Sequence, residues 1–383
     1  MERSLVEHRG PGAERGRAMT LFLCGDVMTG RGIDQVLPHP SDPRLHEPFV
    51  HDAREYVGLA EAANGPMPRP VDLQYIWGDA LDELAHLAPD ARIVNLETSI
   101  TGSDDHWPVK EIHYRMHPDN VGCLTSAGID VCALANNHVL DFGHAGLRET
   151  LRALARAGIR TAGAGLSLAE AREPALVEIS GTGRLVVFAL GDETSGIPAS
   201  WAATDDRPGI DLLPDLSEAT AGAILERLRR VKRAGDVVVA SIHWGSNWGY
   251  EIPRAQQRFA HWLLDGGVDV VHGHSSHHVR PIEIYGGKLV LYGCGDFVDD
   301  YEGIAGYEEF RDDLTAMYFP TVEPATGRLQ SLRLTPMQIR SFRVTRATPA
   351  DAGWLAQTLH RVSRPFGTRV ELTADGGLAV HPG

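Results

Sequence analysis

The sequence predicts a layered α/β protein, and three observations carry that prediction. Apolar strand-like runs alternate with amphipathic helix-like runs from about residue 19 to residue 345. Polar side chains gather directly after the apolar strands, as they do at the carboxyl edge of an α/β sheet. No internal repeat or low-complexity linker divides this stretch. We therefore expect one domain at 19–345, a mobile leader at 1–18, and a C-terminal extension at 346–383 packed on its outside.

The expected elements follow from hydrophobic periodicity and from stop signals along the chain. Buried strands are predicted at 19–27, 91–97, 128–138, 184–192, 236–245, 268–274 and 288–298. Helices are predicted at 78–90, 144–158, 217–235, 254–267 and, in the extension, 351–362. Gly158 is typical of a helix end and Ser217 of a helix N-cap. The proline-rich stretch from Pro38 to Pro70 lacks periodicity, and we interpret it as an inserted lid or pocket wall.

Composition narrows the class of protein. The formal net charge of −15 argues against general binding to nucleic acid or to an anionic membrane. No apolar run approaches the roughly 20 residues of a membrane span. The first residues have no apolar signal-peptide core, so we expect a cytoplasmic protein. The four cysteines lack CxxC spacing and are predicted to be free thiols.

The candidate functional residues stand where the predicted strands end. They are Asp26, Asn95, Glu97, Asn136, Asn137, His138, Asp192, His243, His272, His274, His277, His278 and Asp296. Because the carboxyl ends of neighbouring strands meet at one edge of a sheet, we expect a shared site there. Carboxylate, amide and imidazole groups without paired cysteines suit hard or borderline divalent ions. The sequence therefore predicts one or two divalent ions (Mn, Zn, Fe, Mg or Ca) and no organic cofactor.

Five ordered blocks of the sequence carry a family resemblance. They are LFLCGDVMTGRG, IVNLETSI, LANNHVLDFG, SIHWGSNWGYE and GHSSHHVRPIEIYGGKLVLYGCGDF. These blocks resemble those of the CapA family, named for poly-γ-glutamate capsule synthesis, over roughly residues 20 to 310. The resemblance implies a branch of the metallo-dependent phosphatase (calcineurin-like) superfamily. Its expected architecture is an αββα sandwich, in which helices flank two packed mixed sheets.

The resemblance also implies roles for single positions. The implied metal ligands are Asp26, Glu97, Asn137, His243, His274 and His277. Glu97 takes the place of a carboxylate that bridges two ions, and His138 is expected to act beside the substrate. The phosphatases usually carry a histidine two residues after the first aspartate, where this chain has Met28. The phosphatase pattern gives His278 no role, which leaves it free for acid–base chemistry.

Other polar residues near the blocks support the expected site. Asn95 and Asp141 are expected to orient metal ligands, and His272 is either structural or orients a ligand. Cys294 is either an inert buried thiol or, with Asp296, a proton carrier in the pocket.

A further block similar to the family's contains two candidate substrate-binding residues. Lys110 and Arg115 lie in WPVKEIHYRMHPDN. Arg115 either clamps a substrate carboxylate with two parallel hydrogen bonds or forms a surface salt bridge.

Three functions compete on this basis. We favour a metal-dependent, cofactor-independent peptide epimerase that inverts a Cα from L to D, near the C-terminus of its peptide. Its product is a ribosomal peptide such as a lasso peptide, or poly-γ-glutamate, and a peptide-recognition protein is the expected partner. The proton carriers expected for this reaction, beyond the ligand set, are His138, His278, Cys294 and Asp296. The alternatives are a metal-dependent phosphoesterase and a non-catalytic partner in capsule synthesis.

Overall fold

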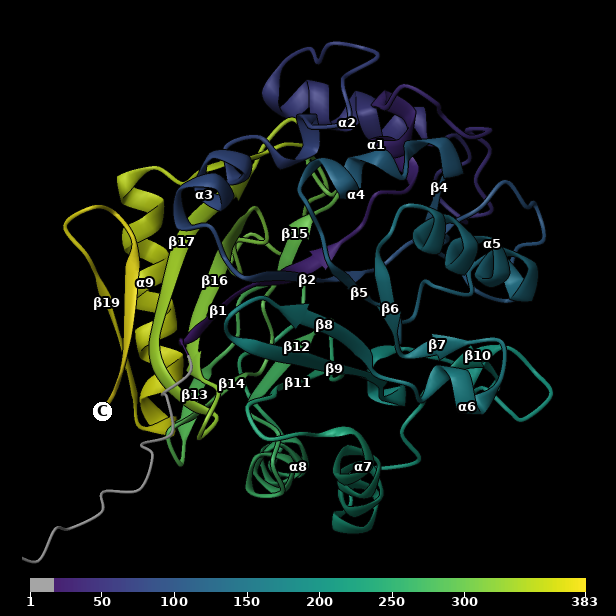
Figure 1. The fold of residues 1–383 in the computed structure, drawn as a ribbon. Helices are drawn as coiled ribbons and strands as arrows, with labels where there is room; N and C mark the ends of the chain where they lie inside the picture. The colour runs from purple at the N-terminus through teal and green to yellow at the C-terminus, as the bar shows by residue number, and fades with distance from the viewer. Residues whose placement is uncertain (1–16) are drawn as a thin grey trace, which may run out of the picture.

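Two mixed β-sheets pack face to face at the centre of the molecule (Figure 1). The computed structural model describes residues 17–383, so almost all of the leader expected at 1–18 lies outside the described residues. Within residues 17–383, one large sheet has ten strands and the other has six. Helices cover the outer sides, which confirms the predicted α/β fold of two packed mixed sheets flanked by helices.

The ten-stranded sheet combines a parallel half and an antiparallel half around β1. Its order is β19 (Thr368–Leu372), β20 (Leu378–Pro382), β17 (Arg328–Ile339), β16 (Leu314–Glu323), β1 (Met19–Val27), β2 (Ala91–Leu96), β5 (Val131–Ala133) and β6 (Arg160–Ala162). Strands β1, β2, β5 and β6 run parallel, whereas β16, β17, β20 and β19 pair antiparallel. Two short strands complete the sheet: β15 (Asp296–Val298) pairs with β1, and β18 (Val344–Arg346) pairs with β17.

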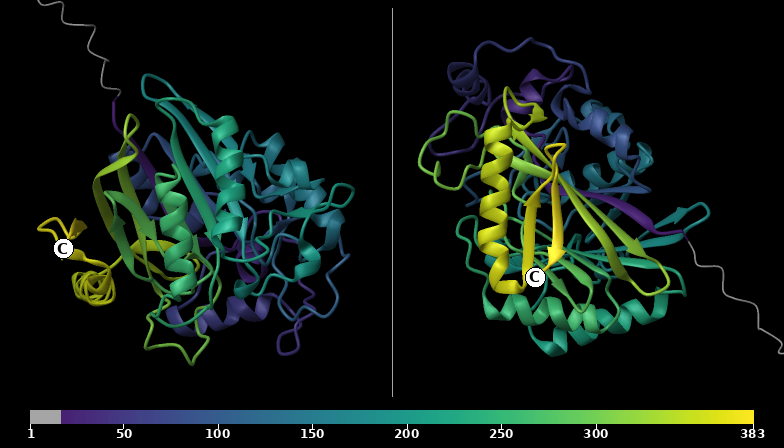
Figure 2. Two further views of the ribbon diagram at one scale, coloured as in Figure 1. Left: turned by 90° about the horizontal axis from the view of Figure 1, so that it is seen from below. Right: turned by 90° about the vertical axis from the view of Figure 1, so that its left-hand side faces the viewer.

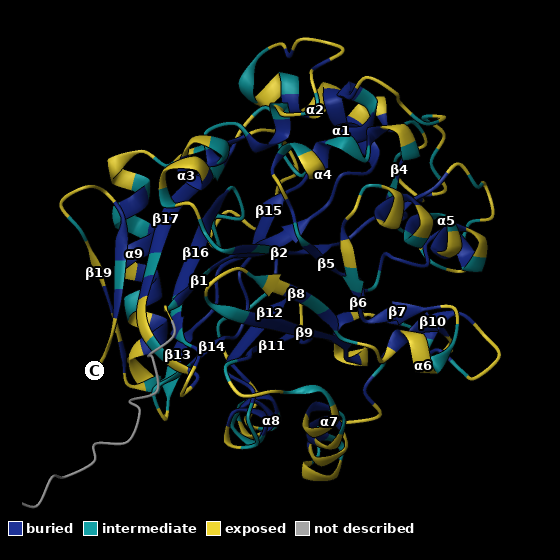
Figure 3. Cartoon of the chain, in the orientation of Figure 1, coloured by how far each residue is buried: buried dark blue, intermediate teal, exposed yellow. Residues whose placement is uncertain are grey.

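The six-stranded sheet is apolar on both faces. Its order is β13 (Ile282–Tyr285), β14 (Lys288–Leu291), β12 (Val270–His274), β11 (Val237–His243), β9 (Gly183–Gly191) and β8 (Ala175–Ile179). Successive side chains of a strand point to opposite faces, so β9 contributes to two cores. Val187 belongs to the core that includes the ten-stranded sheet, and Val186 to the core under the outer helices. The central strands of both sheets are accordingly buried, whereas β19 and the first half of β17 carry exposed residues (Figure 3).

Helices cover both outer sides of this pair of sheets. Helices α7 (Glu218–Val231) and α8 (Arg254–Asp265) lie against the six-stranded sheet (Figure 1). Helix α9 (Pro349–Ser363) packs beside β19 and β17 (Figure 2). The others are α1 (Arg31–Val36), α2 (Arg54–Asn64), α3 (Ala80–Leu87), α4 (Gly122–Ser126), α5 (Gly143–Arg156) and α6 (Leu168–Ala171). Two small sheets pair β3 (Ser99–Ile100) with β4 (Arg115–Met116) and β7 (Ala164–Gly165) with β10 (Gly209–Ile210).

Several local predictions hold and others are wrong. Ser217 caps α7, because its side chain accepts a hydrogen bond from the backbone N–H of Thr220. The strand predicted at 288–298 is two strands, since β14 joins the six-stranded sheet and β15 joins the ten-stranded one. Residues 134–138 leave the strand early and turn towards the site. The insertion from Pro38 to Pro70 contains α2, a helix for which we found no periodic signal.

The predictions about the cysteines and about membrane-spanning segments can be compared with the described residues. The four cysteines are free, as predicted, and all four are buried. Across residues 17–383, no helix combines the length and the apolar character that a membrane crossing requires. The expected cytoplasmic location stays a prediction.

Gly25 tests how closely β15 packs against β1 within the ten-stranded sheet. A Cβ at this position would lie 1.8 Å from the backbone oxygen of Gly295, where β15 meets β1. We expect Gly25→Ala to lower the free energy of unfolding by about 3 kcal/mol or more, because the obstacle is backbone and not a flexible side chain. The matched control is Gly58→Ala in α2, where a Cβ meets nothing within 4 Å. It should raise stability by up to about 1 kcal/mol. Urea unfolding measures both, and equal midpoints would contradict the prediction.

Candidate metal centre and cavity

The carboxyl ends of strands from both sheets meet at one place, as the sequence predicts. In the ten-stranded sheet, Asp26 at the end of β1 pairs in register with Asn95 of β2 and with Asp296 of β15. In the six-stranded sheet, His243 of β11 stands opposite His274 of β12. Parallel pairing in both sheets therefore brings these chemically active side chains to neighbouring edges.

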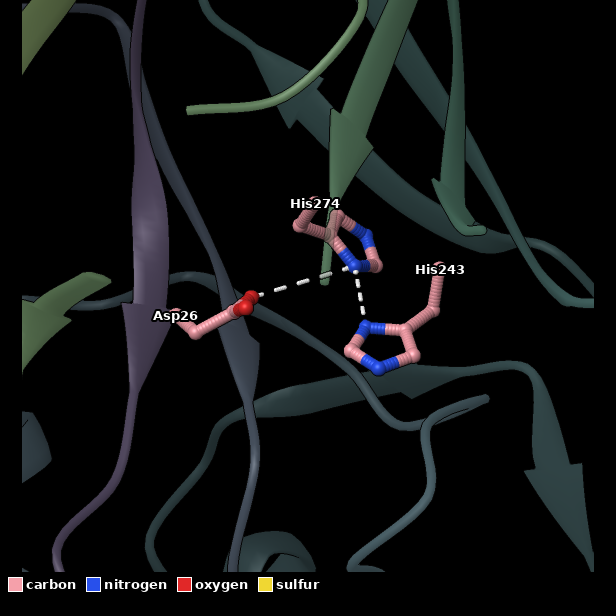
Figure 4. A group of neighbouring side chains, drawn as sticks. All are labelled: Asp26, His243 and His274. Carbon is pink, nitrogen blue, oxygen red and sulfur yellow. Dashed lines mark hydrogen bonds and ion pairs between the residues drawn. The ribbon is translucent and has the colours of Figure 1, made fainter. Parts of the chain in front are cut away.

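Asp26, His243 and His274 form the group best placed to hold a metal ion (Figure 4). Each is buried, and the three offer ligand atoms that all lie within 4.8 Å of one another. Oδ1 of Asp26 is 3.9 Å from Nδ1 of His274, which is 2.9 Å from Nδ1 of His243. Two ring nitrogens this close need a hydrogen or a cation between them. Two nitrogens bound to one ion at about 2.1 Å lie about 3.0–3.4 Å apart, so the pair fits a divalent ion.

Three polar side chains surround this group: the amides of Asn95 and Asn137 and the carboxyl group of Glu97. Nδ2 of Asn95 donates to Oδ1 of Asp26 at 2.8 Å and to Oε2 of Glu97 at 3.2 Å, which is the orienting position expected for Asn95. Oε2 of Glu97 is 3.9 Å from Nδ1 of His243. Oδ1 of Asn137 accepts from Nε2–H of His243 at 2.9 Å, which leaves Nδ1 of that ring for the ion.

Burial perturbs the carboxylates of this group. Burial, and next the neighbouring Asp296 carboxylate, raise the pKa of Asp26 to about 7. Burial and the charge of Asp26 raise the pKa of Glu97 well above its usual value. A divalent cation favours the ionised carboxylates and opposes both effects. The donor set therefore fits the predicted metal centre.

His138 forms a hydrogen-bonded pair with Asp141 at the edge of this group. Nδ1–H of His138 donates to Oδ2 of Asp141 at 2.6 Å, and Asp141 is ion-paired with Lys110. Nζ of Lys110 lies 2.9 Å from the same Nδ1. The other ring nitrogen, Nε2, is 3.8 Å from Oε1 of Glu97. The pair thus directs one nitrogen of His138 towards the candidate metal group.

His277 forms a second pair of the same kind with Asp296. Its Nδ1 lies 3.0 Å from each carboxylate oxygen of Asp296, and its Nε2 lies 2.9 Å from Nδ2 of Asn247. Both ring nitrogens therefore have protein partners, whereas a metal ligand needs one nitrogen free. The geometry favours a carboxylate-held base over the ligand role expected for His277.

A cavity of about 530 Å³ opens over the metal group and both histidine pairs. Its lining includes six of the residues predicted from sequence: Glu97, Lys110, Asn137, His138, His243 and His277. Loop residues 107–112 form one wall. Asp26, His274 and Asp296 lie behind this lining, in contact with its residues Ser275, His243 and His277, respectively.

The structure gives His278 surroundings unlike those expected, and it gives Cys294 those of the inert buried thiol. Nδ1 of His278 donates to the backbone oxygen of Val279 at 3.0 Å, and Nε2 accepts from the backbone N–H of Gly249 at 3.0 Å. Its ring is stacked on Phe310, and burial lowers its pKa to about 3. Burial raises the pKa of the Cys294 thiol well above its usual value. Neither lines the cavity, so the geometry favours structural roles for both.

Arg115 also lies away from the cavity lining. Its guanidinium donates to Oδ1 of Asp104 at 2.6 Å and to backbone oxygens of Ser103 and Asp42. These bonds tie the proline-rich insertion to the loop before β4. They correspond to the salt-bridge interpretation and not to a substrate clamp.

The sequence did not predict a role for four residues near the cavity. Tyr301 lines it, and the hydroxyl of Tyr114 donates to the Tyr301 hydroxyl at 2.9 Å. The ring of Tyr114 meets His138 edge-on at 4.5 Å, and that of Tyr301 meets His277 at 5.2 Å. Asn247 holds His277, and Ser275 donates its backbone N–H to Asp26 at 3.0 Å from a strained φ of 99°. Asn247 and Ser275 stand inside quoted blocks, but no periodicity marks the tyrosines.

Comparisons with known proteins agree on one family. A family model described as "Bacterial capsule synthesis protein PGA_cap" matches residues 20–301. The chain is 50% identical over 365 residues to the "Probable polyglutamine synthesis accessory protein" of Mycobacterium tuberculosis H37Rv, covering 95% of this chain and 96% of that protein. It is 30% identical to the PGA biosynthesis protein CapA of Bacillus subtilis, over 67% of this chain and 62% of that protein. It is 27% identical to the capsule biosynthesis protein CapA of Bacillus anthracis, over 82% and 65%.

Asp26→Asn tests the electrostatic state of the metal group. The pKa of Asp26 is raised from 3.8 to about 7, so the folded chain holds this proton more tightly than the unfolded chain. The stability of the wild type should therefore fall as pH rises from about 4 to about 7. In chelator at pH 8, we expect Asp26→Asn to be more stable than the wild type, and to lose this advantage near pH 4. Urea unfolding across this pH range measures the difference.

The control for this test is Asp205→Asn, which changes an exposed aspartate. Asp205→Asn should follow the wild type at every pH. Adding Mn²⁺ should stabilise the wild type and the control but not Asp26→Asn. Identical pH profiles for Asp26→Asn and the wild type would contradict the assignment.

His278→Ala separates a structural histidine from a catalytic one. Removing this buried, stacked ring leaves a cavity, so we expect the free energy of unfolding to fall by roughly 2–4 kcal/mol. Metal affinity should not change, because His278 contacts no member of the metal group. His86→Ala, at an exposed position of α3, should change stability by no more than about 0.5 kcal/mol. An unchanged unfolding midpoint for His278→Ala would argue against this role.

Proposed function

This chain belongs to the PGA_cap family of bacterial capsule synthesis proteins, as the five sequence blocks predicted, and we propose that it is a metal-dependent peptide epimerase. The proposed reaction inverts the Cα of a residue in a glutamyl or glutaminyl peptide or polymer. The substrate class follows from the names of the relatives, which refer to polyglutamine and PGA synthesis. These names give no such support to a ribosomal peptide as the substrate.

One observation carries this proposal: two histidine–aspartate pairs open on the same cavity, beside one candidate metal group. His138 is held by Asp141, and His277 is held by Asp296. Both histidines line the cavity together with His243 of the metal group. Inversion at carbon needs a base on one face of the Cα and an acid on the other. Hydrolysis needs no second pair of this kind.

The protein's own groups can carry each proton step. When the Cα–H bond breaks, the proton passes to Nε2 of one histidine, and the other histidine returns a proton from the opposite face. At His277 the substrate would take the place of the Asn247 amide, which lies 2.9 Å from this Nε2. A carboxylate at Nδ1 stabilises the imidazolium that forms, as Asp296 does for His277. Lys110 is placed to balance the charge of Asp141. A divalent ion held by Asp26, His243 and His274 would act as a Lewis acid towards the carbonyl next to the Cα.

The residues around Met28 weaken the phosphoesterase alternative. Two-metal hydrolysis needs ligands for both ions. The chain has a buried Met28 where the phosphatases usually have a ligating histidine, and Sδ of Met28 lies 3.7 Å from the Tyr301 hydroxyl. His277, the other imidazole expected there, is held by Asp296 and Asn247. These contacts favour one ion.

A non-catalytic role stays a second candidate, because relatives are named accessory proteins. In that role the chain would stabilise a polymer-synthesis complex, and the cavity would bind the polymer without changing it. The two candidates make opposite predictions for isotope exchange.

Incubation in deuterium oxide tests the proposal. The metal-loaded protein would be offered short γ-linked and α-linked glutamyl peptides. We expect one deuterium at Cα for each inversion and no loss of peptide mass, measured by mass spectrometry and chiral amino-acid analysis. Release of phosphate from an aryl phosphate without deuterium uptake would support hydrolysis instead. Peptide binding with neither reaction would support the accessory role.

His277→Asn and His138→Asn sharpen this test, because the asparagine Nδ2 can replace the hydrogen bond of histidine Nδ1 to its aspartate. Each variant removes one of the two acid–base groups. Inversion should fall by roughly 10²–10⁴-fold in each. The remaining histidine should still exchange the Cα proton of one epimer, and the two variants should prefer opposite epimers. His86→Asn is the matched exposed control, and equal inversion by His277→Asn and the wild type would rule out the two-base arrangement.

A further inference from the structure

Three buried side chains form a hydrogen-bonded line behind the candidate metal group. Nε2 of His272 lies 2.8 Å from the backbone oxygen of Cys24 in β1. Nδ1 of the same ring lies 3.1 Å from Oγ of Ser241 in β11. That hydroxyl lies 2.9 Å from Nε2 of His274. The proposed reaction uses neither His272 nor Ser241.

Strand register explains why this line forms. β11 and β12 run parallel, with Ser241 opposite His272 and His243 opposite His274. Residues two apart on a strand point to the same face, so Ser241 and His243 share a face, as do His272 and His274. The hydroxyl therefore lies between two imidazoles. All of these side chains are at most 1% exposed.

The carbonyl at one end fixes the direction of every hydrogen bond. A carbonyl oxygen only accepts, so Nε2 of His272 carries a hydrogen. Within the described chain, this ring contacts a carbonyl and a hydroxyl and is paired with no carboxylate, so it is neutral and its Nδ1 accepts. Ser241 has one hydroxyl hydrogen and donates it to that Nδ1. Its oxygen is then left to accept from Nε2–H of His274.

We infer that Ser241, backed by His272, is a positioning residue that holds His274 as its Nε2–H tautomer and presents the Nδ1 lone pair to Asp26 and His243. This deepens the proposed function and rests on its metal centre only for the consequence. A neutral imidazole binds a metal through the nitrogen that lacks a hydrogen. In the opposite tautomer, the Nδ1–H of His274 would point at the position between the candidate ligands.

His243 is oriented in the same way as His274, but by a different partner. Its Nε2–H donates to the amide oxygen of Asn137, so its Nδ1 lone pair also faces the group. Each ligand histidine is therefore oriented by a neutral oxygen. Ser241 provides it for His274 from within β11, and Asn137 provides it for His243 from the turn after β5.

The tautomer can be measured without any metal. In the full-length protein labelled with ¹⁵N-histidine and kept in chelator, NMR distinguishes Nδ1–H from Nε2–H rings. Signals are assigned by their loss in single His272→Gln and His274→Gln variants. We expect both rings to be Nε2–H in the wild type, so that without an ion the hydrogen between Nδ1 of His274 and Nδ1 of His243 belongs to His243. A hydrogen on Nδ1 of His274 in the wild type overturns the inference.

Ser241→Ala removes the acceptor without enlarging a side chain. We expect its His274 to populate both tautomers, and its dissociation constant for Mn²⁺ to rise roughly 10–100-fold, as for other groups that orient a metal ligand. Ser363→Ala removes another buried hydroxyl, which accepts from the backbone N–H of Ile282 at 2.9 Å far from the metal group, and should bind Mn²⁺ like the wild type.

The two proposals can fail separately. If the wild type binds Mn²⁺ and Ser241→Ala keeps both its tautomer and its dissociation constant, the role of Ser241 is wrong and the metal centre stands. If the wild type binds no Mn²⁺ or Zn²⁺, the proposed metal centre fails. The wild-type tautomer spectrum then still decides the role of Ser241.

Discussion

The site depends on one close backbone contact, where β15 pairs with β1 beside Gly25. The backbone N–H of Asp26 donates to the oxygen of Gly295 at 2.9 Å, and that of Met28 to the oxygen of Val298 at 2.7 Å. The preceding strand, β14, belongs to the other sheet, so four residues carry the chain from one sheet to the other. This crossing brings Asp296 beside Asp26 and within reach of His277. It therefore fixes both the spacing of the sheets and the position of one proposed base.

The same contact concentrates negative charge in a buried place. Asp26, Glu97 and Asp296 are each at most 2% exposed, and burial raises the pKa of all three. Lys110 is the lysine whose charge acts on Glu97, but it is already paired with Asp141. Without a cation, these buried carboxylates oppose folding. Such locally destabilising arrangements are typical of functional sites. A bound divalent ion offers the missing positive charge.

The sequence predicts the members of the metal group better than the residues around it. Asp26, His243 and His274 end regular strands, and parallel pairing alone makes strand ends converge. The division of residues 288–298 into two strands could not be predicted from the sequence. The sheet that each strand joins depends on contacts with residues far away in the chain. Arg115 and the tyrosines depend on irregular loops, where no periodicity gives the direction of a side chain. His277 and His278 are neighbours of one residue type, and only the fold distinguishes them.

What distinguishes these histidines is the group that holds the second ring nitrogen. Neutral oxygens hold His243 and His274, which leaves each with a lone pair directed at the metal group. Carboxylates hold His138 and His277, where each can stabilise the imidazolium formed during proton transfer. Burial lowers the pKa of both rings, so each is neutral before it accepts a proton. Backbone groups hold both nitrogens of His278, and its ring does not line the cavity, which favours a structural role. The hydrogen-bond partners of each ring thus distinguish metal ligands, bases and structural histidines, although all of them lie in the same few blocks of sequence.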